Sequence, residues 1–94
     1  MITAIVLVET AVDRVPEVAT ALAELDGVSE VYSVTGDIDL VAIVRVKQHE
    51  DLEAVIADRL GKVDGVRGTR TYLAFRAYSR HDLEAAFSLG IEAP

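Results

Sequence analysis

Hydrophobic residues recur along the chain with two different spacings, and segments of one spacing alternate with segments of the other. Residues 2–9 are apolar on both alternating faces and residues 38–46 are strongly apolar, which is typical of central strands. Residues 28–34 and 66–78 predict two more strands. Two segments between the strands have the spacing of amphipathic helices, with apolar stripes formed by Val15, Val18, Ala19, Leu22 and Leu25, and by Leu52, Val55, Ile56 and Leu60.

Capping residues predict where the two helices begin and end. We expect Asp13 to cap the first helix, with Pro16 in its first turn and Asp26-Gly27 at its end. The second helix is predicted over residues 48–62, ended by Gly61 and Gly65. Both helices therefore lie between strands, as in a βαβ unit.

A short phrase occurs twice in the chain and indicates an internal repeat. Leu25-Asp26-Gly27-Val28 returns as Val63-Asp64-Gly65-Val66, at a spacing of 38 residues. Two copies predict two similar β-α-β halves within one domain. The order β-α-β-β-α-β is that of an α+β, ferredoxin-like fold with a four-stranded antiparallel sheet and two helices on one face. Right-handed crossovers place the first and third strands at the sheet centre.

The second face of this sheet is the reason to expect a dimer. Two helices cover one face of a four-stranded sheet, while 51% of the residues are hydrophobic. Exposed apolar side chains cost about 25 cal/mol per Å², so we expect a second copy to cover the other face. Residues 1–94 are predicted to form a single domain, in which residues 80–94 form a helical tail that docks on a neighbour.

Charge and composition exclude several classes of function. Nine basic residues are scattered among sixteen acidic ones, and the net charge of −7 disfavours direct binding of nucleic acid. The chain has no cysteine, and no apolar run reaches the roughly 18 residues of a membrane span. The N-terminus does not resemble a signal peptide. We therefore expect a cytoplasmic protein that does not bind membranes.

The candidate ligand-binding residues are polar residues of one loop and one strand. Thr35-Gly36-Asp37 predicts a tight hairpin, because glycine supplies the positive φ that such turns need. Asp37 and Asp39 in this hairpin can be interpreted in two ways. They are either ordinary turn residues or a binding site for an ammonium or hydroxyl group. Thr69 and Thr71 share one face of the last strand and suit a small polar ligand, or simply a strand.

Catalysis, metal binding and cofactor binding are not expected. His49 and His81 lack the spacing of a zinc helix, and both stand at predicted helix starts. Ser79 and Ser88 lack the Gly-x-Ser-x-Gly context of a nucleophile elbow. No glycine-rich phosphate loop occurs. The residues thus predict neither a catalytic group, nor a metal site, nor a bound cofactor.

These features resemble a known family. The predicted strand order, Gly36-Asp37-Ile38-Asp39-Leu40 in the hairpin and Gly65-Val66-Arg67-Gly68-Thr69-Arg70-Thr71-Tyr72 in the last strand resemble the effector-binding (RAM) domain of Lrp/AsnC transcriptional regulators. The resemblance covers residues 1–80. In that family a helix-turn-helix domain precedes this module, whereas here Met1 opens directly on the first strand. The resemblance therefore suggests a stand-alone RAM protein without its own DNA-binding domain.

The resemblance implies a ligand site and an assembly. Such modules form homodimers through their sheets and rings of dimers, commonly octamers and sometimes decamers, and they bind an amino acid or related small effector between dimers. By position, the ligand-binding residues are Gly36, Asp37, Asp39, Thr69 and Thr71. The implied roles are close backbone approach at Gly36, binding of the α-ammonium by Asp39, and orientation by a threonine hydroxyl. Ile38 departs from the aromatic residue that many members carry.

Three functions follow, in this order of preference. The first is an amino-acid-sensing and oligomerising module. The second is a structural partner that co-assembles with full-length Lrp/AsnC regulators and keeps only a vestigial ligand site. The third is a small enzyme of the dimeric ferredoxin-like type, which the few aromatic residues and the lack of a catalytic group disfavour.

Overall fold

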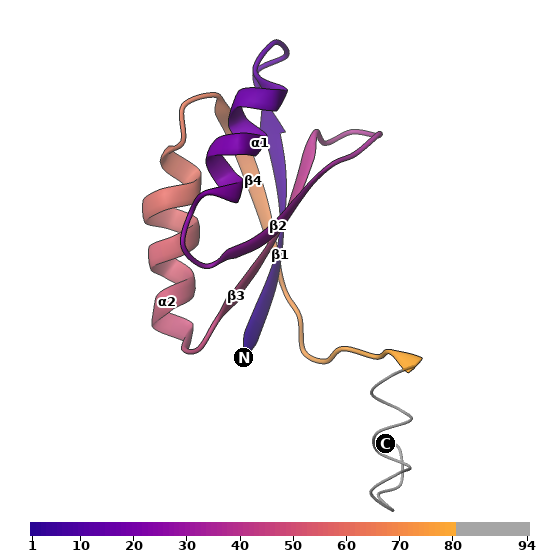
Figure 1. The fold of residues 1–94 in the computed structure, drawn as a ribbon, viewed down its shortest axis with the longest axis vertical. Helices are drawn as coiled ribbons and strands as arrows, with labels where there is room; N and C mark the ends of the chain where they lie inside the picture. The colour runs from indigo at the N-terminus through magenta and orange to yellow at the C-terminus, as the bar shows by residue number, and fades with distance from the viewer. Residues whose placement is uncertain (81–94) are drawn as a thin grey trace, which may run out of the picture.

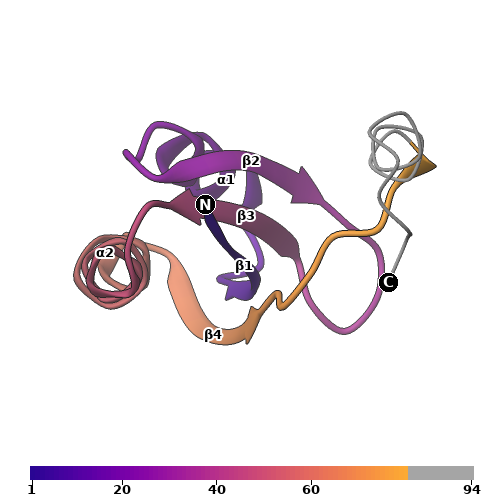
Figure 2. The same ribbon diagram turned by 90° about the horizontal axis from the view of Figure 1, so that it is seen from below.

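Four strands form one antiparallel sheet, and the helices cover one of its faces (Figures 1 and 2). The computed structural model describes residues 1–80. Its elements are β1 (Ile2–Thr10), α1 (Val15–Ala23), β2 (Val28–Ser33), β3 (Leu40–Val46), α2 (His49–Glu53) and β4 (Val66–Leu73). The strand order β2-β3-β1-β4 confirms the predicted fold and the central position of the first and third strands.

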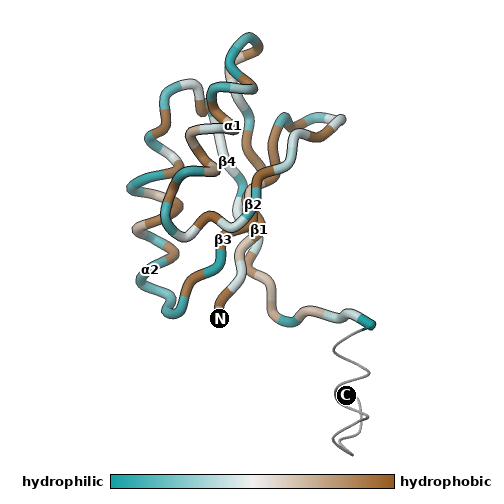
Figure 3. Tube along the Cα trace, in the orientation of Figure 1, coloured by the Kyte–Doolittle hydropathy of each residue, from teal (hydrophilic) through white to brown (hydrophobic). Residues whose placement is uncertain are grey.

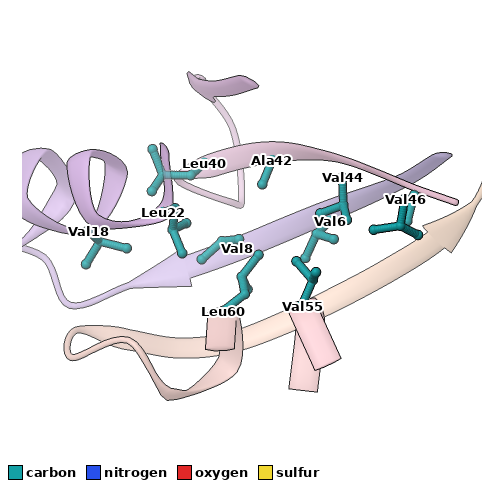
Figure 4. Close-up of a cluster of buried hydrophobic side chains, with 11 residues drawn as sticks. Val6, Val8, Val18, Leu22, Leu40, Ala42, Val44, Val46, Val55 and Leu60 are labelled. Carbon is teal, nitrogen blue, oxygen red and sulfur yellow. The ribbon is translucent and has the colours of Figure 1, made fainter. Parts of the chain in front are cut away.

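The core lies between the sheet and the helices, where apolar side chains of β1 and β3 meet those of the helical segments (Figure 4). Alternate residues of the two central strands point to this side because side chains alternate along a strand. The hydropathy of α1 and α2 alternates along the chain in Figure 3, as expected for helices with one buried stripe. The buried residues are Ala4, Val6, Val8, Val18, Leu22, Leu40, Ala42, Val44, Val46, Val55 and Leu60.

The internal repeat forms two matching turns, and each turn packs against the helix of the other half. Gly27 and Gly65 have φ of 94° and 97°, a conformation that favours glycine. A Cβ on Gly27 would lie 2.6 Å from Val55, and one on Gly65 would lie 2.7 Å from Val18. α1 ends at Ala23, before the predicted end at Asp26-Gly27, so the glycines shape the turns that follow the helices and make room for the helix of the other half.

The first helix begins one residue later than a cap at Asp13 requires, so that prediction is wrong. Arg14 is the N-cap residue, its side chain makes no capping bond, and Val18 N–H donates to its carbonyl over 2.9 Å. Pro16 stands in the first turn. Because proline has no N–H, it removes one of the donors that a capping side chain would serve.

The second helical segment covers the predicted range but is not a regular α-helix. The α-helical part ends at Glu53, residues Ala54–Arg59 are π-helical, and Leu60–Lys62 form a 3₁₀ turn. Gly61 therefore lies inside the segment rather than ending it. Bonds of the i→i+5 type bring residues five apart towards one face, and Val55 and Leu60 are both buried.

Two strand boundaries also differ from the prediction. β3 begins at Leu40, so residues 34–39 form a longer loop rather than a tight hairpin. β4 ends at Leu73 instead of Tyr78 because β1 offers almost no further partner: Ala74 N–H donates to the Thr3 carbonyl, and β1 begins at Ile2. The chain then leaves the sheet (Figure 1).

The described part of the chain leaves the predicted tail without a structural test. The predicted helical tail at 80–94 falls almost wholly outside the described residues, which end at residue 80.

Within residues 1–80, no helix has the length and apolar character needed to cross a membrane.

Candidate functional site

The loop at residues 34–39 is fixed to the end of β1 by Asp39. Thr10 N–H donates to Asp39 Oδ2 over 2.9 Å, and Asp39 N–H donates to the Val8 carbonyl over 3.1 Å. Val34 N–H closes the loop by donating to the Asp39 carbonyl over 3.1 Å. Asp39 therefore holds the base of the loop, and only its second carboxylate oxygen has no such bond in the described structure.

The tip of the loop is open to solvent. Gly36 has φ of 125°, and no atom lies within 4 Å of the position that a Cβ would take. The Asp37 side chain is 89% exposed, and its Oδ2 lies 3.7 Å from Nη2 of Arg70 on β4. The fold thus brings the loop tip to the edge strand through an ion pair.

Thr69 and Thr71 lie on the other face of the sheet from Arg70. Thr69 pairs with Val8 and Thr71 with Val6, whose side chains face the helices, whereas Arg70 pairs with Leu7. Both threonines are exposed because β4 is an edge strand. Within residues 1–80, no hydrogen bond joins either threonine side chain to the loop. The structure therefore places Asp37 beside Arg70 but does not bring the threonines of the same copy to the carboxylates.

A shallow depression of about 140 Å³ lies on the open face, between β1 and β4. Its lining residues are Leu7, Glu9, Gly68, Thr69 and Arg70. Only Thr69 among them is a site residue predicted from the sequence. The signal that could have located Glu9 and Gly68 is the β1–β4 register, which sets them opposite each other and which no local pattern shows.

The open sheet face combines an apolar centre with a polar cluster on β2 and β3. Ile5, Leu7, Val41 and Ile43 lie partly exposed on this face, and Tyr32 and Tyr72 are about half exposed. This is the second apolar face that the sequence predicted.

Three polar side chains form a network on the same face. The Tyr32 hydroxyl donates to Glu30 Oε2, and Arg45 Nη1 donates to Glu30 Oε1 over 3.0 Å. The hydrogen bond from Tyr32, followed by that from Arg45, lowers the pKa of the Glu30 carboxyl. The same bond to Glu30 raises the pKa of the Tyr32 hydroxyl. All three side chains reach solvent, so the network belongs to the surface rather than to a buried reaction centre.

The described part of the chain does not gather metal-binding side chains into a site. Residues 1–80 contain no cluster of three or more His, Asp or Glu side chains that could hold a metal ion. His49 is exposed at the start of α2, and His81 lies outside the described residues.

Comparison with known proteins gives consistent matches. Residues 3–83 match the family model of the Lrp/AsnC ligand binding domain. The HTH-type transcriptional regulator FL11 of Pyrococcus abyssi is 33% identical over 75 residues, which are 80% of this chain and 49% of the regulator. The chain spans about half the length of the curated relatives it matches.

Solved structures agree with this match. The protein TTHA0845 from Thermus thermophilus is 51% identical with a TM-score of 0.80, and the match covers 85% of this chain and all of that protein. E. coli AsnC shares the fold, with a TM-score of 0.76 at 19% identity, over 81% of this chain and 52% of that protein. The resemblance found in the sequence is confirmed.

Proposed function

The chain belongs to the Lrp/AsnC ligand-binding domain family, and we propose that it is an amino-acid effector-binding and oligomerisation module related to these transcriptional regulators. One observation carries the proposal. The loop at 34–39 is anchored through Asp39 and holds the exposed Asp37 carboxylate beside the Arg70 guanidinium. Exposed groups of opposite charge on a fixed backbone are suited to a small ligand that is itself charged at both ends.

We place the effector at Gly36, Asp37, Asp39, Thr69 and Thr71. Gly36 lets a ligand approach the backbone, and Asp37, with the second oxygen of Asp39, offers negative charge to an α-ammonium group. The threonine hydroxyls of one copy lie on the opposite sheet face from Arg70. A site that uses both the loop and the threonines therefore takes them from two copies, in line with a cleft between neighbouring dimers.

The assembly that we propose is a homodimer formed through the open sheet face, and a ring of dimers such as an octamer or decamer. Support comes from the apolar centre of that face, formed by Ile5, Leu7, Val41 and Ile43. Covering it with a second copy removes apolar surface from water at about 25 cal/mol per Å². Full-length Lrp/AsnC regulators are further candidate partners, because they contain the same domain.

A thermal-shift screen against the twenty L-amino acids tests the effector proposal. A ligand that binds only the folded protein, at about 100 times its Kd, adds roughly 2.7 kcal/mol. For a domain of this size we expect Tm to rise by about 10 °C or more. Asp37→Asn should abolish the shift, whereas Asp58→Asn on the helical surface should not. A flat screen on a protein of defined mass would contradict the proposal.

A second candidate function has one observation in its favour. Asp39 Oδ2 already accepts a hydrogen bond from Thr10 N–H, so part of the proposed ligand set serves the loop itself. This favours a structural co-assembly partner with a vestigial site. Native mass spectrometry after co-expression with a full-length Lrp/AsnC regulator tests it. Mixed assemblies whose mass and stability do not change when any amino acid is added support this alternative. Separate assemblies of the two proteins exclude it.

An enzymatic function has less support. The curated relatives that match the chain are transcriptional regulators. Neither the described residues nor the sequence motifs supply a nucleophile beside a base, which covalent or acid–base catalysis needs.

A further inference from the structure

We propose that the depression between β1 and β4 is the part of the effector site that recognises the two charged groups of a free α-amino acid. In it, Arg70 binds the α-carboxylate and Glu9 binds the α-ammonium, above Gly68. The inference rests on the proposed function and extends it to residues outside the loop. It places the protein groups that bind the ligand's charges on two adjacent strands as well as on the loop.

The strand register places the two charges on one face. Leu7 pairs with Arg70 and Glu9 pairs with Gly68. Directly opposed residues of an antiparallel pair point to the same side, so Glu9 and Arg70 stand diagonally on the open face. Gly68 lies directly opposite Glu9, next to Arg70 on the same face of β4, and has no side chain. A Cβ at Gly68 would lie 3.6 Å from Glu9 Oε2, in ordinary contact, so the absence of one leaves the floor of the depression open.

Both charged groups have bonding capacity left for a ligand. Within residues 1–80 the Glu9 carboxylate forms neither a hydrogen bond nor an ion pair. Arg70 is 55% exposed, and its one ion pair within the same residues is the 3.7 Å contact with Asp37. A guanidinium carries five N–H donors in a fork that fits a carboxylate with two parallel bonds. A ligand carboxylate can therefore form closer bonds with Arg70 than Asp37 does.

The charge and size of the depression select the ligand class. Glu9 and Arg70, the two charged residues that line the depression, carry opposite charges, which suits a zwitterion better than a phosphate or a dicarboxylate. A zwitterion places its carboxylate on Arg70 and its ammonium group on Glu9. The volume of about 140 Å³ suits such a small group rather than a nucleotide. Leu7 lines the depression and also belongs to the apolar face that the proposed dimer covers, so the amino-acid side chain would lie at the margin of that interface.

Asp37, proposed above as a carboxylate for the ammonium group, also positions Arg70 in this arrangement. Asp39 fixes the base of the loop to Thr10, and this anchor holds Asp37 near the guanidinium. Arg70 spans from β4 towards the loop and thereby connects the depression to the carboxylates proposed above.

Ligand analogues on the unchanged protein test the assignment first. The probes are the twenty L-amino acids and, for each one that raises Tm, its α-amide and its N-acetyl form. We expect both derivatives to lose at least tenfold in affinity, because one lacks the carboxylate and the other the ammonium. Derivatives that bind as well as the parent amino acid overturn this inference and leave the proposed function standing. A protein that responds to no amino acid overturns both.

Variants then assign each charge to its residue. The Arg70→Gln variant should bind the amino acid and its α-amide equally well. The Glu9→Gln variant should bind the amino acid and its N-acetyl form equally well. Gly68→Ala keeps every charge and fills the floor, so it should weaken binding of all probes. Arg67→Gln is the matched control on the same strand and should bind as the wild type does. Unchanged preferences in Arg70→Gln and Glu9→Gln overturn the assignment.

Discussion

At the scale of single residues, Asp39 combines a structural contact with a proposed ligand contact in one carboxylate. One oxygen accepts the N–H of Thr10, a donor that is only partly accessible to water. The second oxygen has no partner in the described structure. Loss of binding in an Asp39 variant is therefore ambiguous, whereas Asp37 is exposed and reports on the ligand more directly.

The anchoring role of Asp39 predicts a graded loss of stability. Asp39→Ala leaves the Thr10 N–H without its acceptor and should lower the free energy of unfolding by about 1–3 kcal/mol. Asp39→Asn keeps an acceptor oxygen and should lose less. Urea denaturation measures both variants, and hydrogen exchange reports on the Thr10 amide. If that amide exchanges equally slowly in Asp39→Ala, the anchor is not what holds the loop.

The lowered pKa of Glu30 predicts that this residue stabilises the fold near neutral pH and that the stabilisation is lost at acid pH. Tyr32 and Arg45 lower its pKa in the folded protein, from an ordinary value of 4.5. A lowered folded-state pKa stabilises the fold above the unfolded value, and this stabilisation is lost as pH falls through the folded pKa. Glu30→Gln should therefore lose less stability than the wild type between about pH 6 and about pH 3. Glu53→Gln on α2 is the control and should follow the wild type; an equal slope in all three proteins would contradict the network.

At the scale of elements, the sequence predicted which segments are strands and helices but not all of their ends. β1 and β3 could be predicted as central because both of their faces are apolar. The end of β4 could not, because it depends on where the neighbouring strand begins. The π-helical part of the second segment likewise follows from the buried positions of Val55 and Leu60 rather than from propensity.

The candidate site was predictable only where a local sequence pattern marks it, and not where it depends on the pairing of strands. Gly36 and Asp37 stand in a local pattern that marks a loop, and the loop is present with the positive φ that glycine favours. Glu9 and Gly68 face each other only through strand pairing, so no local pattern marks them. The opposite orientations of Thr69 and Arg70 were predictable from strand alternation.

The two repeated turns give a prediction about how the halves are joined. Gly27→Ala or Gly65→Ala places a Cβ at positive φ and within 2.7 Å of a valine methyl in the other half. We expect each to lower the free energy of unfolding by about 2 kcal/mol or more, from the unfavourable backbone and the overpacking. Gly68→Ala, with ordinary φ and a 3.6 Å contact, is the control in urea denaturation. Equal stability of all three variants would show that the turns are not the junction.

At the scale of the whole molecule, the unpaired sheet face and the edge strand carry the proposed dimer interface and the proposed ligand site. Helices cover one face of the sheet (Figure 2). The other face presents apolar residues beside the depression and the loop. A dimer formed on this face and a ligand bound at its margin would therefore share neighbouring residues. This arrangement offers a direct route by which an effector could change the assembly.

The proposed dimer predicts the effect of a charge on the open face. Ile43→Glu places a carboxylate at the apolar centre of β3, where a second sheet would bury it without a partner. We expect the mass measured by light scattering to fall to that of the 10.1 kDa chain. Val12→Glu, at a loop position that is 96% exposed, should leave the mass unchanged. An unaltered mass in Ile43→Glu would place the interface elsewhere.

Equilibrium dialysis against an equimolar mixture of the twenty L-amino acids tests the central claim most directly, because it measures bound effector without assuming which one it is. The salt concentration should be about 0.15 M, so that the net charge of −7 does not redistribute charged amino acids by itself. Amino-acid analysis of both compartments should show one amino acid, or a few of one chemical class, retained at up to one molecule per chain. Equal concentrations on both sides would contradict an effector-binding function and leave the structural co-assembly partner as the better account.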